Sequence, residues 1–135
     1  MFTIDRNSSC VAISIQNKIP NSKIIEGIRE VLSLSLGEVV LSDQQDNHAN
    51  ILPKLYIDYN IKPKGIPIYC MICSVLIHEI IPDWEVFLIR LANNLSSEIF
   101  IDVGEEGFLI TPSGVVRKIE YCFFFVNDIE CLKIL

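Results

Sequence analysis

The sequence is poor in basic residues. Its 135 residues include 11 Lys and Arg against 17 Asp and Glu, which gives a formal net charge of −6. Nucleic-acid phosphates and anionic membrane surfaces attract basic proteins, so this balance argues against both as partners. A basic protein partner is favoured instead, because opposite electrostatic fields speed the encounter of two proteins.

Motifs that carry chemistry are also missing. The chain contains no G-x-S-x-G, no phosphate-binding loop and no H-E-x-x-H. Its one C-x-x-C, at Cys70 and Cys73, lies in an apolar run, whereas a redox motif opens a helix whose dipole lowers the thiol pKa. We interpret both residues as buried, inert cysteines on opposite faces of a strand. The sequence predicts neither an enzyme nor a cofactor, and an open cleft with either thiol beside His78 would favour the opposite.

Regular cysteine spacing and a signal peptide are absent too. The five cysteines are an odd number, and residues 1–9 lack a basic-then-apolar pattern. We therefore expect a cytoplasmic protein with five free thiols. The apolar run 65–81 is shorter than the roughly 20 residues that a membrane helix needs. Within it, residues 68–77 predict a central strand buried on both faces, with a helix as the competing interpretation.

Half of the residues are apolar, enough to build the core of a single domain over residues 1–135. Two amphipathic helices are predicted at about 21–35 and 83–96. Asn21 or Ser22 is expected to cap the first and Asp83 the second, and Gly37 is the expected end of the first helix. In the second helix one apolar stripe comprises Trp84, Phe87, Leu88, Leu91, Ala92 and Leu95.

The order of predicted elements recurs along the chain. Ile19-Pro20-Asn21 aligns with Ile81-Pro82-Asp83. Each segment precedes a helix that is followed by two short strands, in halves at about 1–60 and 66–121. The predicted fold class is therefore α+β, with a mainly antiparallel sheet built from two β-α-β-β units. Both helices are expected on one face of this sheet, since sequential strands tend to be neighbours.

Residues 122–135 form an apolar C-terminal tail. They read C-F-F-F-V-N-D-I-E-C-L-K-I-L, and Asn127-Asp128 predicts a turn between two short strands. We expect the tail to pack on the sheet. An exposed tail would invite pairing with another chain, so a homodimer through the tail is the alternative.

Two acidic segments occupy equivalent places in the predicted repeat, because each joins the two strands that follow a helix. The segments are 42–50 and 102–107, and together they would form an acidic patch if the sheet places them close to each other. The alternative is a pair of solvated loops. The first segment lacks the glycine and the terminal glutamate of a calcium loop, so no metal site is predicted. The candidate partner-binding residues are Asp43, Asp46, His48, Asp102, Glu105 and Glu106.

Residues 84–119 resemble a module of small bacterial toxin-immunity proteins. The resemblance rests on L-A-N-N-L-S-S-E-I-F-I-D, a short acidic turn, and F-L-I-T-P-S-G-V-V-R-K-I. Such proteins end in a helix with L-A-x-x-L, a strand ending in Asp and a hairpin closing on P-x-G. The resemblance implies a protein that binds and blocks a cognate toxin, as in contact-dependent inhibition or type VI secretion. The long apolar tail departs from this pattern, and a small non-enzymatic adaptor, chaperone or structural binding module is the alternative function.

Overall fold

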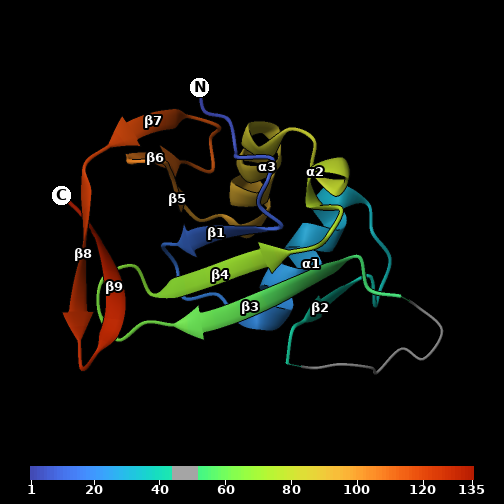
Figure 1. The fold of residues 1–135 in the computed structure, drawn as a ribbon, viewed down its shortest axis with the longest axis horizontal. Coiled ribbons are helices and arrows are strands. Elements are labelled where there is room, and N and C mark those ends of the chain that lie inside the picture. Colours follow the sequence, from blue (N-terminus) through green and yellow to red (C-terminus); the bar gives the residue numbers. More distant parts are fainter. Residues whose placement is uncertain (44–51) are drawn as a thin grey trace.

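Seven strands form one sheet in the computed structural model, which describes residues 1–43 and 52–135 (Figure 1). All neighbouring strands are antiparallel except the β2–β3 pair, which is parallel. This arrangement confirms the predicted α+β fold with a mainly antiparallel sheet. In spatial order the strands are β2 (Val39–Leu41), β3 (Leu55–Ile61), β4 (Ile68–Cys73), β1 (Cys10–Ile15), β5 (Ile99–Val103), β6 (Glu106–Ile110) and β7 (Val116–Ile119).

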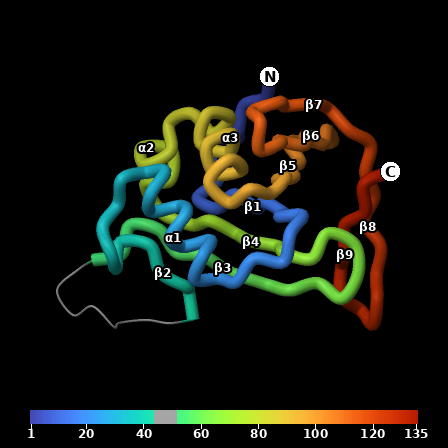
Figure 2. Tube along the Cα trace, turned by 180° about the vertical axis from the view of Figure 1, so that it is seen from behind, coloured from blue at the N-terminus to red at the C-terminus, as the bar shows by residue number. Residues whose placement is uncertain are grey.

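Helices α1 (Asn21–Leu32) and α3 (Trp84–Leu95) pack against the same face of this sheet, as Figure 2 shows from behind. Between β4 and α3 lies a short helix, α2 (Ile77–Ile80), which the sequence did not predict. The apolar stripes of α1 and α3 and every second residue of the central strands form one core. Its fully buried side chains include Ile13, Ile15, Ile24, Ile28, Ile57, Ile72, Leu88 and Leu91.

The two helices differ in how their ends are closed. Asp83 caps α3 as predicted, because its carboxylate accepts the backbone N–H of Val86 at 3.1 Å. In α1 the predicted cap is wrong: Asn21 is already the first helical residue, and no side chain caps this end. The predicted end at Gly37 is also wrong, because Ser33 adopts the left-handed conformation. The N–H of Leu34 then bonds to the carbonyl of Arg29, which closes the last turn earlier.

The two halves of the chain pair their strands differently. Strands β5 and β6 form an antiparallel hairpin with Gly104 and Glu105 in the turn, whereas β2 and β3 run parallel. The order strand–helix–strand–strand therefore recurs along the chain with a different pairing in each half. The halves at about 1–60 and 66–121 are not equivalent β-α-β-β units in this topology.

The prediction of a strand at 68–77 that is buried on both faces is wrong in its length and in its burial. Strand β4 ends at Cys73, and burial alternates along it. Ile68, Cys70 and Ile72 face the helices, while the residues between them face the side that no helix covers. The sequence pattern concealed this alternation because Met71 and Cys73 on the open face are themselves apolar.

The C-terminal tail forms a separate hairpin of β8 (Tyr121–Val126) and β9 (Ile129–Ile134). Asn127 and Asp128 both have positive φ, as a two-residue type I′ turn requires, which confirms the predicted turn. The hairpin packs on the open face of the sheet, as expected. There Leu132 forms a second small core with Ile66, Phe100 and Leu109.

The expectation of five free thiols is wrong. Cys10 and Cys73 lie directly opposite each other on β1 and β4 and form a disulfide. Cys70, Cys122 and Cys131 are free. Burial raises the pKa of Cys70 to about 12, which fits the prediction of an inert thiol. For Cys73 the prediction of a free thiol is wrong, because Cys73 is bonded to Cys10. The sequence did not indicate this bond, since it depends on strand register and joins residues 63 positions apart.

Glu38 leads to a prediction about acid stability. Its carboxylate accepts the hydroxyl and the N–H of Ser35 and pairs with Lys54 at 3.0 Å, which together hold its pKa at about 2. A carboxyl with a lowered folded pKa stabilises the fold above its ordinary pKa of 4.5, and this contribution disappears as the pH falls toward 2. Glu38→Gln should therefore flatten the loss of stability between pH 4.5 and 2, measured by urea unfolding. The exposed Glu79→Gln is the control, and equal pH profiles for both variants would contradict this role.

Candidate protein-binding surface

The open face of the sheet carries carboxylates from several strands. On β3, Asp58 lies opposite Met71 of β4, which in turn lies opposite Ala12 of β1. Asp102 lies on the next strand, β5, and also belongs to this face. Asp58 also accepts a hydrogen bond from the hydroxyl of Ser42, just beyond the end of β2.

Asp102 is partly buried at the rim of a hollow of about 200 Å³. Strands β1 and β5 pair only at Ser14–Phe100 and Ile15–Ile99. The hollow is lined by residues 10–12 of β1, by residues 101–104 at the end of β5, and by Ile4, Asp5 and Ser8 from the segment before β1. Burial raises the pKa of Asp102 above its ordinary range, and the carboxylate of Glu130 on β9 adds to this effect.

Tyr69 lies among three of these carboxylates. Burial raises its pKa, and Asp102, Glu130 and Asp58 raise it further. The ammonium group of Lys62 lies 5.0 Å from the centre of its ring. The pKa of Tyr121 is raised by burial and then by Asp102 and Glu105. We define the acidic face as Asp58, Tyr69, Asp102, Glu105, Tyr121 and Glu130.

The structure separates the residues predicted to bind a partner. Asp102 and Glu105 belong to the acidic face. Glu106 pairs with Val103, whose side chain packs in the main core, so Glu106 points to the helix side, where it binds Lys118 at 3.1 Å. Asp43 is exposed at the β2 edge, whereas Asp46 and His48 lie outside the described residues.

Ser42 and Asp43, the described part of the first predicted acidic segment, do not meet the second segment. Strands β3, β4 and β1 lie between β2 and β5. Four strand spacings of roughly 4.8 Å separate the edge near Asp43 from Asp102 by about 19 Å. Asp58 lies between them in the same row, so the carboxylates extend across the open face instead of forming one compact patch.

Sequence reasoning missed Asp58, Tyr69, Tyr121 and Glu130. The run L-Y-I-D-Y-N-I in β3 contained a usable signal, because Tyr56, Asp58 and Asn60 alternate with the core residues and must share the other face. No comparable signal placed Glu130, since its position depends on where the β8–β9 hairpin docks.

His78, which an enzyme would use beside Cys70 or Cys73, makes structural hydrogen bonds instead. His78 accepts the indole N–H of Trp84 on Nδ1 and, with its proton on Nε2, donates to the carbonyl of Ser8 at 2.7 Å. It therefore links α2 and α3 to the segment before β1. Within residues 1–43 and 52–135, no group of three or more His, Cys, Asp or Glu side chains is placed to hold a metal ion. In the same residues no helix has the length and apolar character to cross a membrane.

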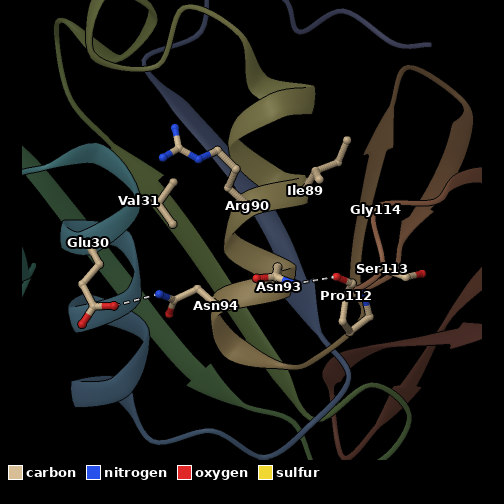
Figure 3. A pocket seen from close by; sticks show the side chains of 9 residues that line it. All are labelled: Glu30, Val31, Ile89, Arg90, Asn93, Asn94, Pro112, Ser113 and Gly114. Carbon is tan, nitrogen blue, oxygen red and sulfur yellow. Dashed lines mark hydrogen bonds between the residues drawn. The ribbon is translucent and has the colours of Figure 1, made fainter.

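Another hollow, of about 410 Å³, lies between α1, α3 and the β6–β7 loop (Figure 3). Asn94 donates to Glu30 across the two helices at 2.8 Å, and Asn93 donates to the carbonyl of Pro112 at 3.0 Å. These side chains hold α3 to its neighbours, and the hollow is open to solvent. Its polar groups thus have a structural role.

The chain matches no protein-family model, and comparison with curated proteins and solved structures found nothing similar to it. The likeness to toxin-immunity proteins therefore rests on the motifs in residues 84–119 alone.

Proposed function

We propose that this protein binds and neutralises a cognate bacterial toxin, and that the acidic face contacts a basic toxin domain. Four carboxylates from β3, β5, the β5–β6 turn and β9 gather around Tyr69 and Tyr121, with Lys62 as a nearby cation. The protein as a whole is also acidic, with a net charge of −6. Such a surface attracts basic partners and accelerates their association.

The observation that carries the proposal is the unfavourable environment of Asp102. Burial and Glu130 raise its pKa, so ionisation of Asp102 is less favourable than that of an ordinary exposed aspartate. An Arg or Lys side chain from a partner would relieve this repulsion and would stabilise the charged form. Perturbed ionisable groups of this kind gather at functional sites more often than elsewhere.

The function is tested by co-expression with the product of the gene directly upstream, which the resemblance makes the expected toxin. The protein should co-purify with that product and should restore growth to cells that express it. If the upstream product is toxic, and this protein neither binds it nor restores growth, the proposed function is wrong.

The acidic face is tested by the double variant Asp102→Asn/Glu130→Gln. We expect on the order of tenfold weaker toxin binding at low salt, because two carboxylates that steer the partner are lost. Ionised Asp102 opposes folding at neutral pH, since its folded pKa is raised, so its amide should not lower the melting temperature. The matched control is Glu106→Gln, which removes an exposed carboxylate on the helix side. Equal binding by the double variant and the wild type would contradict the assignment of the acidic face.

A further inference from the structure

Outer strand edges expose unpaired backbone groups, and most such edges in this protein are protected. Strand β2 is only three residues long, and β7 carries Arg117 and Lys118. The outer edge of β9 meets the β3–β4 turn, where the N–H of Ile66 donates to the carbonyl of Leu132 at 2.9 Å. Strand β8 lies beyond β9 in both views (Figures 1 and 2) and has the sequence Y-C-F-F-F-V, without charge or proline. Among the described residues its outer edge has no partner strand.

The ladder between β8 and β9 determines which groups of β8 point outward. The N–H of Leu135 donates to the carbonyl of Glu120, so even-numbered residues of this strand direct their backbone groups toward β9. The carbonyl of Leu132, opposite Phe123, points away from β8, as the same alternation requires. The free edge therefore presents the N–H and C=O groups of Tyr121, Phe123 and Phe125.

We propose that β8 pairs antiparallel with β8 of a second copy of this chain, around a two-fold axis centred on Phe123. Phe123 then lies opposite Phe123 of the second copy, and Tyr121 lies opposite Phe125. Every outward N–H and C=O group of these residues has a partner in this register. The two hairpins become one four-stranded sheet, which is more stable than an isolated two-stranded hairpin.

The side chains of β8 are suited to pairing with β8 of a second copy. Phe123 is 46% exposed and Phe125 is 68% exposed, and both lie on the face that carries Tyr121. In the proposed register these exposed rings pack against aromatic rings of the second copy, which is a favourable cross-strand arrangement. The contact removes the largest exposed apolar side chains of the hairpin from water.

The distribution of charge favours a second copy of this chain as the partner of β8, and it favours the register centred on Phe123. Two chains with a net charge of −6 repel each other, so they associate best where neither carries charge, and β8 is such a segment. A register centred on Phe124 would set Glu120 opposite Asp128 of the second copy, and like charges directly opposite are destabilising. The register centred on Phe123 sets Glu120 opposite Val126 and avoids this repulsion.

The first test is the mass of the protein in solution as a function of concentration, by analytical ultracentrifugation. Wild type should be a dimer, whereas Phe123→Lys and Phe125→Lys should be folded monomers. The matched control is Val75→Lys, because Val75 is 92% exposed in the β4–α2 connection and should not affect the dimer. A wild-type protein that stays monomeric at all concentrations would overturn the proposal. Association that Val75→Lys abolishes and the β8 variants leave intact would overturn it as well.

The second test determines the register with the native Cys122. Position 124 of one copy lies opposite position 122 of the other in the proposed register, in a closely spaced pair suited to a disulfide. Phe124→Cys should therefore cross-link the dimer upon mild oxidation, and Val126→Cys should not. Both variants carry Cys131→Ala, because Cys131 faces position 124 within the hairpin. In a register centred on Phe124, position 126 lies opposite Cys122 and position 124 lies opposite itself, so both variants would cross-link. Cross-linking by Val126→Cys would therefore overturn the stated register.

The dimer contact and the acidic face share Tyr121, but the two proposals are tested by different substitutions. Charges on the acidic face lie on β3, β5, the β5–β6 turn and β9, whereas the dimer contact uses the outer edge of β8. Loss of toxin binding therefore leaves the oligomeric state unchanged, and monomeric variants of β8 retain the carboxylates of the acidic face.

Discussion

Removal of the disulfide between Cys10 and Cys73 is expected to lower the free energy of unfolding by about 4 kcal/mol. The bond closes a loop between residues 63 positions apart, and it joins β1 to β4 in the middle of the sheet. In the chain-entropy model a loop of this length strongly restricts the unfolded chain, and that restriction stabilises the folded state. The measurement is urea unfolding of the Cys10→Ser/Cys73→Ser variant.

Two comparisons isolate the effect of the bond. Wild type in excess reductant should approach the stability of the double variant, because both lack the cross-link. Cys122→Ser removes a free, partly exposed thiol and should change stability little. A double variant as stable as the oxidised wild type would contradict a structural role of the bond.

Gly65→Ala is expected to destabilise the protein by about 2–3 kcal/mol, because Gly65 is where the hairpin contacts the sheet. Gly65 has φ of 74°, and a Cβ there would lie 2.1 Å from the backbone carbonyl oxygen of Leu132. Neither backbone can move without breaking the hydrogen bond between Ile66 and Leu132. The methyl group should therefore force β9 away from the β3–β4 turn.

The matched control is Gly104→Ala. Gly104 has φ of 64°, but a Cβ there would meet no atom within 4 Å, so only the conformational cost of about 1 kcal/mol applies. The difference between the two variants measures hairpin docking. Hydrogen exchange of the Ile66 amide should accelerate in Gly65→Ala and stay slow in Gly104→Ala. Equal destabilisation by the two substitutions would contradict the close approach of β9.

Features that depend on nearby residues could be predicted from the sequence. Asp83 caps α3, and Asn127-Asp128 forms the turn of the last hairpin, because cap and turn chemistry is set within a few residues. Ser33 ended α1 before Gly37, since a serine tolerates the left-handed conformation when the last-turn hydrogen bonds form. Local signals locate such elements well, but they place their boundaries less accurately.

Features that depend on strand register could not be predicted. The Cys10–Cys73 bond requires β1 and β4 to be neighbours with Cys10 opposite Cys73. The acidic face combines Asp58, Asp102 and Glu130, which come from three strands that are distant in the sequence. The sequence indicated Asp102 and Glu105, but it also suggested Glu106, which the alternation of a strand directs to the opposite side of the sheet.

The central claim is that the acidic face attracts a basic toxin domain. The most direct test is the salt dependence of the association rate constant of the wild-type protein and of Asp102→Asn/Glu130→Gln with the upstream gene product. We predict a rate that falls steeply with ionic strength for the wild type and for Glu106→Gln, and a clearly shallower dependence for the double variant. The same salt dependence for all three proteins would contradict the claim.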